Sequence, residues 1–282
     1  MMQIQNNQLL YASYQKHLLS AQKTMERIAT GDRMAKASSD PSGLIQSERM
    51  RSQISGMEQA SKNIQEGKSL LDMADKTMEL SHDILKRLNE LAVKGSSDTI
   101  TDDDRIEMGK EVHSLVEELN EINKRANYNG KTLFDGNGAY HITTSETGRS
   151  TFVALGYFMT DGFGGNGADG KFYVLDDFKI GKKQAISSKE SMENLLSVTS
   201  DAMKAISSER GSIGAKYSRL EVAEKNLENK SEILSKADSR LRDVDVAKET
   251  MELAKHQMLA EASMAMLSQG MKNHQSVLML LK

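Results

Sequence analysis

Every seventh residue in the C-terminal half of the chain is apolar or small over roughly 50 residues: Met192, Thr199, Ile206, Ile213, Leu220, Leu227, Leu234 and Leu241. A helix of that length extends about 75 Å at 1.5 Å per residue. A strict seven-residue repeat keeps one side of a helix against a partner and imposes a left-handed supercoil. The repeat therefore predicts long helices packed in pairs, which fits the sequence better than a compact enzyme fold does.

The N-terminal half carries a matching repeat. Spacings of three and four alternate through Met57, Ala60, Ile64, Gly67, Leu71, Ala74, Met78, Ser81, Leu85, Leu88 and Ala92. A shorter helix continues the pattern at Met108, Val112, Leu115, Leu119, Ile122 and Ala126. Each repeat forms an apolar stripe along its helix, which we call a seam. The seams of the two halves can bury each other most simply in an antiparallel rod. We expect a mainly α fold, built of long antiparallel coiled-coil helices from both chain halves.

A small β module is inserted between the two halves. All six phenylalanines lie in this stretch, at Phe134, Phe152, Phe158, Phe163, Phe172 and Phe178. Thr151–Phe158 and Lys171–Ile180 read as strands, separated by the Gly-rich turn Asp161–Gly170. The expected domains are terminal helices (1–40 with 240–282), a helical rod (41–135 with 186–239) and the β module (136–185).

Several helix starts carry capping signals. Asp40 before Pro41 is typical of an N-cap followed by proline at the first helical position. Thr101, with acidic residues after it, predicts the start of the third helix. Ser187 with Glu190 predicts a capping box for the long C-terminal helix.

Both chain ends are helical and apolar in pattern. The N-terminal repeat runs through Tyr11, Tyr14, Leu18, Ala21, Met25 and Ile28, and the C-terminal repeat through Val244, Ala247, Met251, Ala254 and Met258. Chain ends are normally where order fades, so we expect these helices to pair and then contact other copies. The expected polymerisation interface is Tyr11, Leu18, Met25, Ile28, Met251, Met258, Met264, Met266, Met271, Leu278 and Leu281.

Composition and charge exclude several classes of function. A net charge of −3 offers no electrostatic basis for binding nucleic acid, and no apolar stretch approaches the length of a membrane span. Cysteine is absent, which excludes disulfides and thiolate sites. The glycine pattern Gly165–Gly170 is followed by an expected strand instead of a helix, so it does not predict dinucleotide binding. We expect a non-enzymatic protein without cofactor or metal, and we see no secretory signal.

Several sequence blocks in order resemble bacterial flagellin over nearly the whole chain. They are Met25–Arg33, Ala37–Leu44, Gln59–Gly67, Leu85–Lys94, Asn127–Leu133, Ser239–Glu249 and Val277–Lys282. The resemblance implies a structural subunit that polymerises into the flagellar filament used for motility, with paired terminal helices as the inner core. It also implies unfolded export through the flagellar secretion channel to an extracellular filament. The short β module suggests a flagellin that lacks the large outer domains.

The resemblance also implies partners. These are further copies of the chain, an export chaperone on the C-terminal helix, and the filament cap and hook-junction proteins. An innate immune receptor binds flagellins at the segment that matches Leu85–Lys94. Arg87 and Leu91 match there beside Glu90, whereas Asn89 and Ser114 replace a usual arginine and glutamate. We therefore expect weakened receptor activation.

Two alternatives stay open at this point. A hook–filament junction protein shares the terminal helices but forms a short ring. A soluble coiled-coil adaptor or secretion-needle tip protein would instead have ordered ends. For the flagellin reading we expect Met1–Gly31 and Val244–Lys282 to be disordered in the monomer and to fold on assembly, because an isolated helix has little tertiary support.

Overall fold

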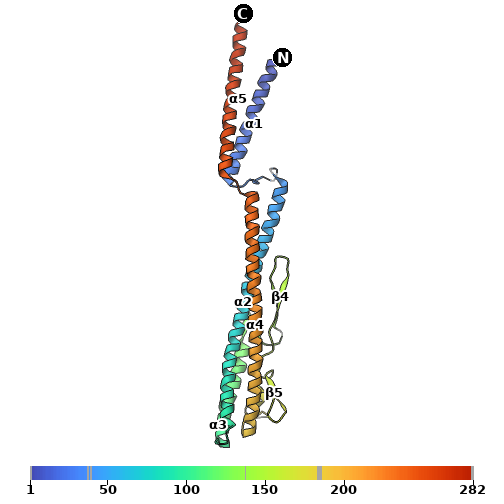
Figure 1. Cartoon of the computed structure of the whole chain (residues 1–282), viewed down its shortest axis with the longest axis vertical. Coiled ribbons are helices and arrows are strands. Elements are labelled where there is room, and N and C mark those ends of the chain that lie inside the picture. The colour runs from blue at the N-terminus through green and yellow to red at the C-terminus, as the bar shows by residue number, and fades with distance from the viewer. Residues whose placement is uncertain (1, 37, 39, 137, 183–185, 281–282) are drawn as a thin grey trace. The chain divides into compact units, whose positions relative to one another are not determined.

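The computed structural model describes residues 2–36, 38, 40–136, 138–182 and 186–280. Within them the chain forms α1 (Met2–Thr30), α2 (Pro41–Gly95), α3 (Asp102–Arg125), α4 (Lys189–Arg242) and α5 (Val246–Leu280), shown in Figure 1. Short strands lie between α3 and α4. The predicted mainly α fold, with three helices before a small β module and two after it, is confirmed.

The chain divides into two compact units. The terminal unit comprises Met1–Ser55 and Lys230–Lys282, and the rod unit comprises Gly56–Asn229. Helices α2 and α4 each contribute one end to the terminal unit and the rest to the rod unit. The terminal unit therefore combines segments from both ends of the sequence, whereas the rod unit is one continuous stretch.

In the rod unit α2 and α4 run antiparallel. Lys68 of α2 pairs with Glu224 of α4 at 3.0 Å, and Asp98, just after α2, pairs with Lys189 at the start of α4 at 2.8 Å. Residue numbers thus increase along α2 while they decrease along the facing stretch of α4. The predicted seams are buried: on α2 from Met57 to Ala92 and on α4 from Met192 to Leu227. Leu234 and Leu241 are only half-buried.

The predicted stripe of helix α3 is confirmed in part. Val112, Leu119 and Ala126 are buried, whereas Met108, Leu115 and Ile122 are only half-buried. The other buried residues are Arg105, Gly109, Val116 and Asn123, which the prediction missed because it followed a single line of apolar side chains. Two polar residues of this stripe are buried with hydrogen-bond partners: Arg105 donates to Gly95 O at 2.9 Å, and Asn123 bridges α2 and the β module.

The β module is three short antiparallel hairpins. β1 (Asn127–Tyr128) pairs with β2 (Lys131–Thr132), β3 (Ala139–Thr143) with β4 (Ser150–Ala154), and β5 (Gly164–Asn166) with β6 (Phe172–Val174). Asn129 and Gly130 have φ of 50° and 78°, as a two-residue hairpin turn requires.

The two predicted strands were too long. Thr151–Phe158 ends as a strand at Ala154, and Lys171–Ile180 contains β6 followed by a 3₁₀ helix, η1 (Leu175–Phe178). The predicted turn Asp161–Gly170 contains strand β5. Among the described residues each of these strands pairs with one neighbour, and no wider sheet extends the ladder.

Close contacts attach this module to the helices. Gly67 of α2 lies directly under Ile142 of β3, where a Cβ would overlap the isoleucine side chain. Farther along the rod, Asn123 donates to the carbonyl of Phe158 at 2.6 Å, and the Phe158 ring packs edge-on against Phe134. A glycine and a buried amide therefore set where the hairpins lie on the rod.

Two of the three capping predictions are confirmed and one is corrected. The Asp40 carboxylate accepts from Gly43 N at 2.9 Å, and Thr101 forms a capping box with Asp104. On α4 the cap is Ser188, which exchanges hydrogen bonds with Ser191. The predicted cap at Ser187 was wrong by one residue, because a serine at the third helical position replaces glutamate in the box.

Candidate assembly surface

The first and last helices form an antiparallel pair in the terminal unit. Figure 1 shows α1 and α5 side by side, with the start of α1 and the end of α5 at the same end of the pair. Arg27 contacts Glu249 at 3.5 Å near one end. The rings of His17 and His256 meet farther along, with centroids 5.8 Å apart. The chain ends therefore do pair with each other, as the sequence predicts.

The seam of this pair is built from small and polar side chains. Ala21, Thr24 and Ala260 are buried, and half-buried residues flank them: Tyr14, His17, Ile28, Leu253, His256, Ser263 and Leu267. Of the C-terminal repeat expected from the sequence, Val244 and Ala254 are half-buried, whereas Ala247, Met251 and Met258 are exposed and lie outside the seam. Each helix is apolar on more than one side, so residue spacing alone does not show which side faces the partner.

Most of the large apolar side chains of the pair are instead exposed. We call this set the outward face: Leu9, Tyr11, Leu18, Leu19 and Met25 of α1 with Met251, Met258, Leu259, Met264, Met266 and Met271 of α5. Met251 is 67% exposed and Met258 is 64% exposed. It includes eight of the expected interface residues, whereas Ile28 is half-buried in the seam. Leu281 and the side chain of Leu278 lie outside what the structure describes.

An exposed apolar surface of this kind is unusual for a monomer. Single exposed apolar residues are common, but eleven large ones on one pair of helices indicate an interaction site. Methionine dominates the α5 part, and its flexible thioether adapts to different neighbours. The surface is suited to packing against other apolar helices.

A cluster of polar contacts, which we call the clasp, joins the end of α1 to the start of α5. We define it as residues Gly31–Met34 after α1 and Arg242–Val244 before α5. Arg242 Nε lies 2.7 Å from Asp32 Oδ2, and Met34 N donates to Asp32 Oδ1 at 2.8 Å. Arg33 N donates to Arg242 O at 2.8 Å, and Val244 N to Gly31 O at 3.2 Å. These bonds make the two connectors a minimal antiparallel ribbon.

The clasp is expected to weaken in acid. Burial alone would raise the pKa of Asp32, but the hydrogen bond from Met34 and the Arg242 guanidinium outweigh it and hold that pKa below 3.8. The carboxylate therefore stabilises the clasp above its unfolded pKa, and this contribution is lost as the pH falls through the lower native value. An NMR titration of the Arg242 Nε–H resonance should show its loss from the bonded position only at a pH below the usual titration range of an aspartate. Loss already within or above that usual range would contradict this assignment.

The segment Leu85–Lys94, for which the resemblance implies receptor binding, lies in the rod unit. Arg87 pairs with Glu111 at 2.7 Å and with Glu90 at 3.4 Å, so its guanidinium is already occupied within the chain. Leu91 is only 4% exposed, which makes it part of the rod core. Asn89 donates to Thr199 Oγ1 at 3.2 Å. Ser114 is exposed on α3, and its hydroxyl donates to the Lys110 carbonyl at 3.1 Å.

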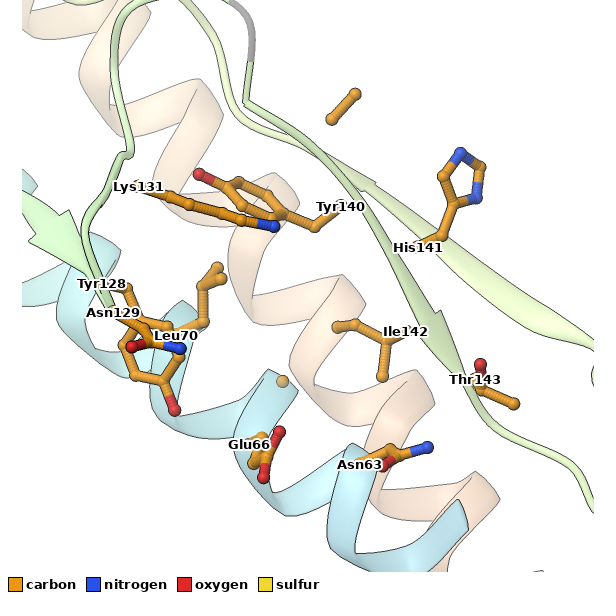
Figure 2. Close-up of a pocket in the computed structure, with 12 residues that line it drawn as sticks. Asn63, Glu66, Leu70, Tyr128, Asn129, Lys131, Tyr140, His141, Ile142 and Thr143 are labelled. Carbon is orange, nitrogen blue, oxygen red and sulfur yellow. The ribbon is translucent and has the colours of Figure 1, made fainter. Parts of the chain in front are cut away.

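A separate pocket of about 380 Å³ lies between α2 and the β1–β2 and β3 strands of the rod unit. Figure 2 shows Glu66 and Lys131 on opposite walls, with Tyr140 beside the lysine. The Tyr140 hydroxyl donates to Thr132 O at 2.9 Å. Burial, with a smaller contribution from Asp135, raises the pKa of this phenol, so it remains a neutral donor. The pocket is polar, and its walls come from α2 and the hairpins of the rod unit.

Among the described residues no helix is long and apolar enough to cross a membrane. The same residues contain no group of three or more histidine, aspartate or glutamate side chains placed to hold a metal ion. What the described structure does offer is a helical rod and a pair of terminal helices with an apolar outward face. Together they define a self-assembling helical subunit.

Comparison with known proteins agrees with this class. The family model for the bacterial flagellin N-terminal helical region matches residues 3–139, and that for the C-terminal helical region matches residues 196–281. Flagellin of Bacillus subtilis is 35% identical over 93% of each chain. The flagellar filament 33 kDa core protein of Treponema phagedenis is 34% identical over 94% of this chain and 93% of its own length.

A solved structure shares the fold. A flagellar hook-associated protein from Vibrio parahaemolyticus superposes with a TM-score of 0.60 at 15% identity, covering 73% of this chain and 100% of its own. The chain belongs to the bacterial flagellins. It is a structural subunit of the flagellar filament, in a family of structural proteins that polymerise with themselves.

Proposed function

We propose that the chain enters the filament through its terminal helix pair, whose outward face packs against the same pair in neighbouring copies. In this arrangement residues 1–40 and 240–282 form the inner core of the filament. The rod of residues 41–135 and 186–239, with the β module of residues 136–185, forms the next layer out. The filament is extracellular, and the chain reaches it as an unfolded polypeptide through the flagellar secretion channel.

The proposal rests mainly on the exposure of the methionine side chains of α5. Five of them belong to the outward face and are more than half exposed, although the seam beside them buries mainly small and polar residues. Burying apolar surface contributes about 25 cal/mol per Å². A helix pair that buries little of its own apolar surface gains most of its stability from neighbours. This is also why we expect both terminal segments to be disordered in the free monomer.

The same surface needs a partner before export. An exposed amphipathic or apolar helix is a typical target for a protein that offers an apolar groove. We propose that a dedicated chaperone binds the methionine-rich part of α5 and keeps the subunit from assembling in the cell. The filament cap and the hook-junction proteins would contact the same terminal helices during growth and at the filament base.

Deletion of one terminal helix tests the assignment. Chains lacking residues 2–30 or residues 246–280 are mixed with short fragments of native filament and observed by negative-stain electron microscopy. The full-length chain should extend the fragments into long filaments, and both deletions should abolish growth. Growth by either deleted chain would contradict the assignment. Short rings from the full-length chain would favour a hook–filament junction protein, and stable monomers a coiled-coil adaptor or needle-tip protein.

The chaperone has its own test. Co-purification from the cytoplasm should recover a small binding protein with the full chain and not with the chain that ends before α5. Equal recovery with both chains would place the chaperone elsewhere on the subunit.

A further inference from the structure

The seam between α1 and α5 does little to specify its own register. Coiled coils align their helices through large apolar knobs and a few buried polar residues. Here the buried side chains are Ala21, Thr24 and Ala260, which are small. Larger apolar residues such as Ile28, Leu253 and Leu267 lie at the edges of the seam and are only half-buried, and most of the others belong to the outward face. A seam of this kind fits nearly as well after one helix slides along the other by a heptad.

A slip of that size would disrupt the outward face. Moving one helix by seven residues displaces it by about 10.5 Å along the axis. Met251 and Met258 would then stand beside different residues of α1 in each subunit. Neighbouring copies in a helical polymer must present identical surfaces, so only one register permits regular growth.

The clasp leaves almost no slack for such a slip. Asp32 forms a β-bridge with Asp243. Helix α1 ends at Thr30 and α5 begins at Val246, so one residue on one side and two on the other separate the bridge from the helices. A residue spans at most ~3.6 Å. The connectors cannot absorb a displacement of 10.5 Å while the bridge and the Asp32–Arg242 ion pair remain formed.

We propose that Asp32 and Arg242 are positioning residues that fix the register of α1 against α5 and so align the outward face for filament growth. This inference rests on the proposed role of the terminal pair in assembly. The two side chains act through the helices and not by touching a neighbouring copy. The ion pair is half-enclosed, with side-chain exposures of 21% for Arg242 and 19% for Asp32, and Asp32 is also fixed by Met34 N.

The absence of cysteine from the chain allows register to be read directly. His17→Cys with His256→Cys reports the native register, because these two rings meet in the seam. His17→Cys with Ser263→Cys reports a slip of one heptad. In filaments grown from native seeds, oxidation should cross-link the first pair and not the second. With Asp32→Arg added, the first cross-link should fall and the second should appear.

Growth kinetics provide the second measurement. Loss of a charge-assisted hydrogen bond of this kind should slow seeded elongation roughly tenfold in Asp32→Arg and in Arg242→Asp. The double variant Asp32→Arg/Arg242→Asp should recover both the growth rate and the native cross-link in part, since the pair is restored with its charges exchanged. The control is Lys36→Glu, which breaks an exposed ion pair with Glu26 beside the clasp and should grow at the wild-type rate.

Two results would overturn the inference. One is native cross-linking and wild-type growth in Asp32→Arg, and the other is a double variant no better than the single ones. Growth by chains that lack α5 would be a different failure, since it would remove the proposed assembly role and not the clasp.

Discussion

A chain carrying Met251→Glu and Met258→Glu is expected to keep a folded rod unit as a monomer and to fail to join filaments. Both methionines are about two-thirds exposed, so the change disturbs little packing within the subunit. In the filament each would place a carboxylate in an apolar contact, which is costly without a partner. With about 1.5–3 kcal/mol lost per methionine, the free-subunit concentration needed for growth should rise at least 100-fold. Sedimentation of seeded mixtures measures it.

The control places the same charges on the same helix. Thr250→Glu with Gln257→Glu alters two exposed residues one heptad apart and removes no methionine. This variant should raise the critical concentration much less than the methionine variant does. Equal effects would show that added charge, and not loss of the apolar face, limits assembly. Wild-type growth by Met251→Glu/Met258→Glu would remove α5 from the interface.

Asn123→Ala is expected to cause the largest loss of stability from a single polar substitution in the rod unit. The Asn123 amide accepts from Ser81 Oγ at 2.9 Å and donates to Phe158 O at 2.6 Å, and it is 2% exposed. Alanine would leave a hydroxyl and a carbonyl buried without partners, at about 3 kcal/mol of unfolding free energy. Urea denaturation followed by circular dichroism at the helix band measures the change.

A double variant separates this mechanism from simple loss of packing. Ser81→Ala in the Asn123→Ala background removes one of the stranded groups, so the double variant should be less destabilised than the sum of the single ones. Asn226→Ala, at an exposed position of α4, should be neutral or slightly stabilising because alanine is the better helix former. Strict additivity between Ser81 and Asn123 would show that the two side chains are not coupled.

The functional consequence of the Asn123 network is the placement of the β module. Asn123 is the point at which α2, α3 and the carbonyl of Phe158 meet. Its loss should therefore loosen the hairpins before it unfolds the helices. Faster amide exchange around Phe158 than in α2 would show this order, whereas equal acceleration in both would indicate global unfolding.

Much of this protein follows from its sequence because a coiled-coil pattern is local. The spacing of apolar residues from Met57 to Ala92 and from Met192 to Leu227 depends only on helical periodicity, and the structure buries both seams. Proline acts on its own backbone, so the start of α2 at Pro41 was also recognisable. The helical class rests on these features, whereas the resemblance to flagellin rests on blocks of sequence such as Ala37–Leu44 and Ser239–Glu249.

Tertiary structure decided which face of each terminal helix turns inward. α1 and α5 are apolar on several sides, and only packing shows that Ala21 and Ala260 lie in the seam while Met251 and Met258 face out. The same holds for the buried stripe of α3, where Asn123 replaces the expected Ile122 because distant groups satisfy its amide. The ion pair of Asp32 with Arg242 joins residues 210 positions apart. Periodicity measures relations along a chain, whereas burial and hydrogen bonding depend on which segments meet in space.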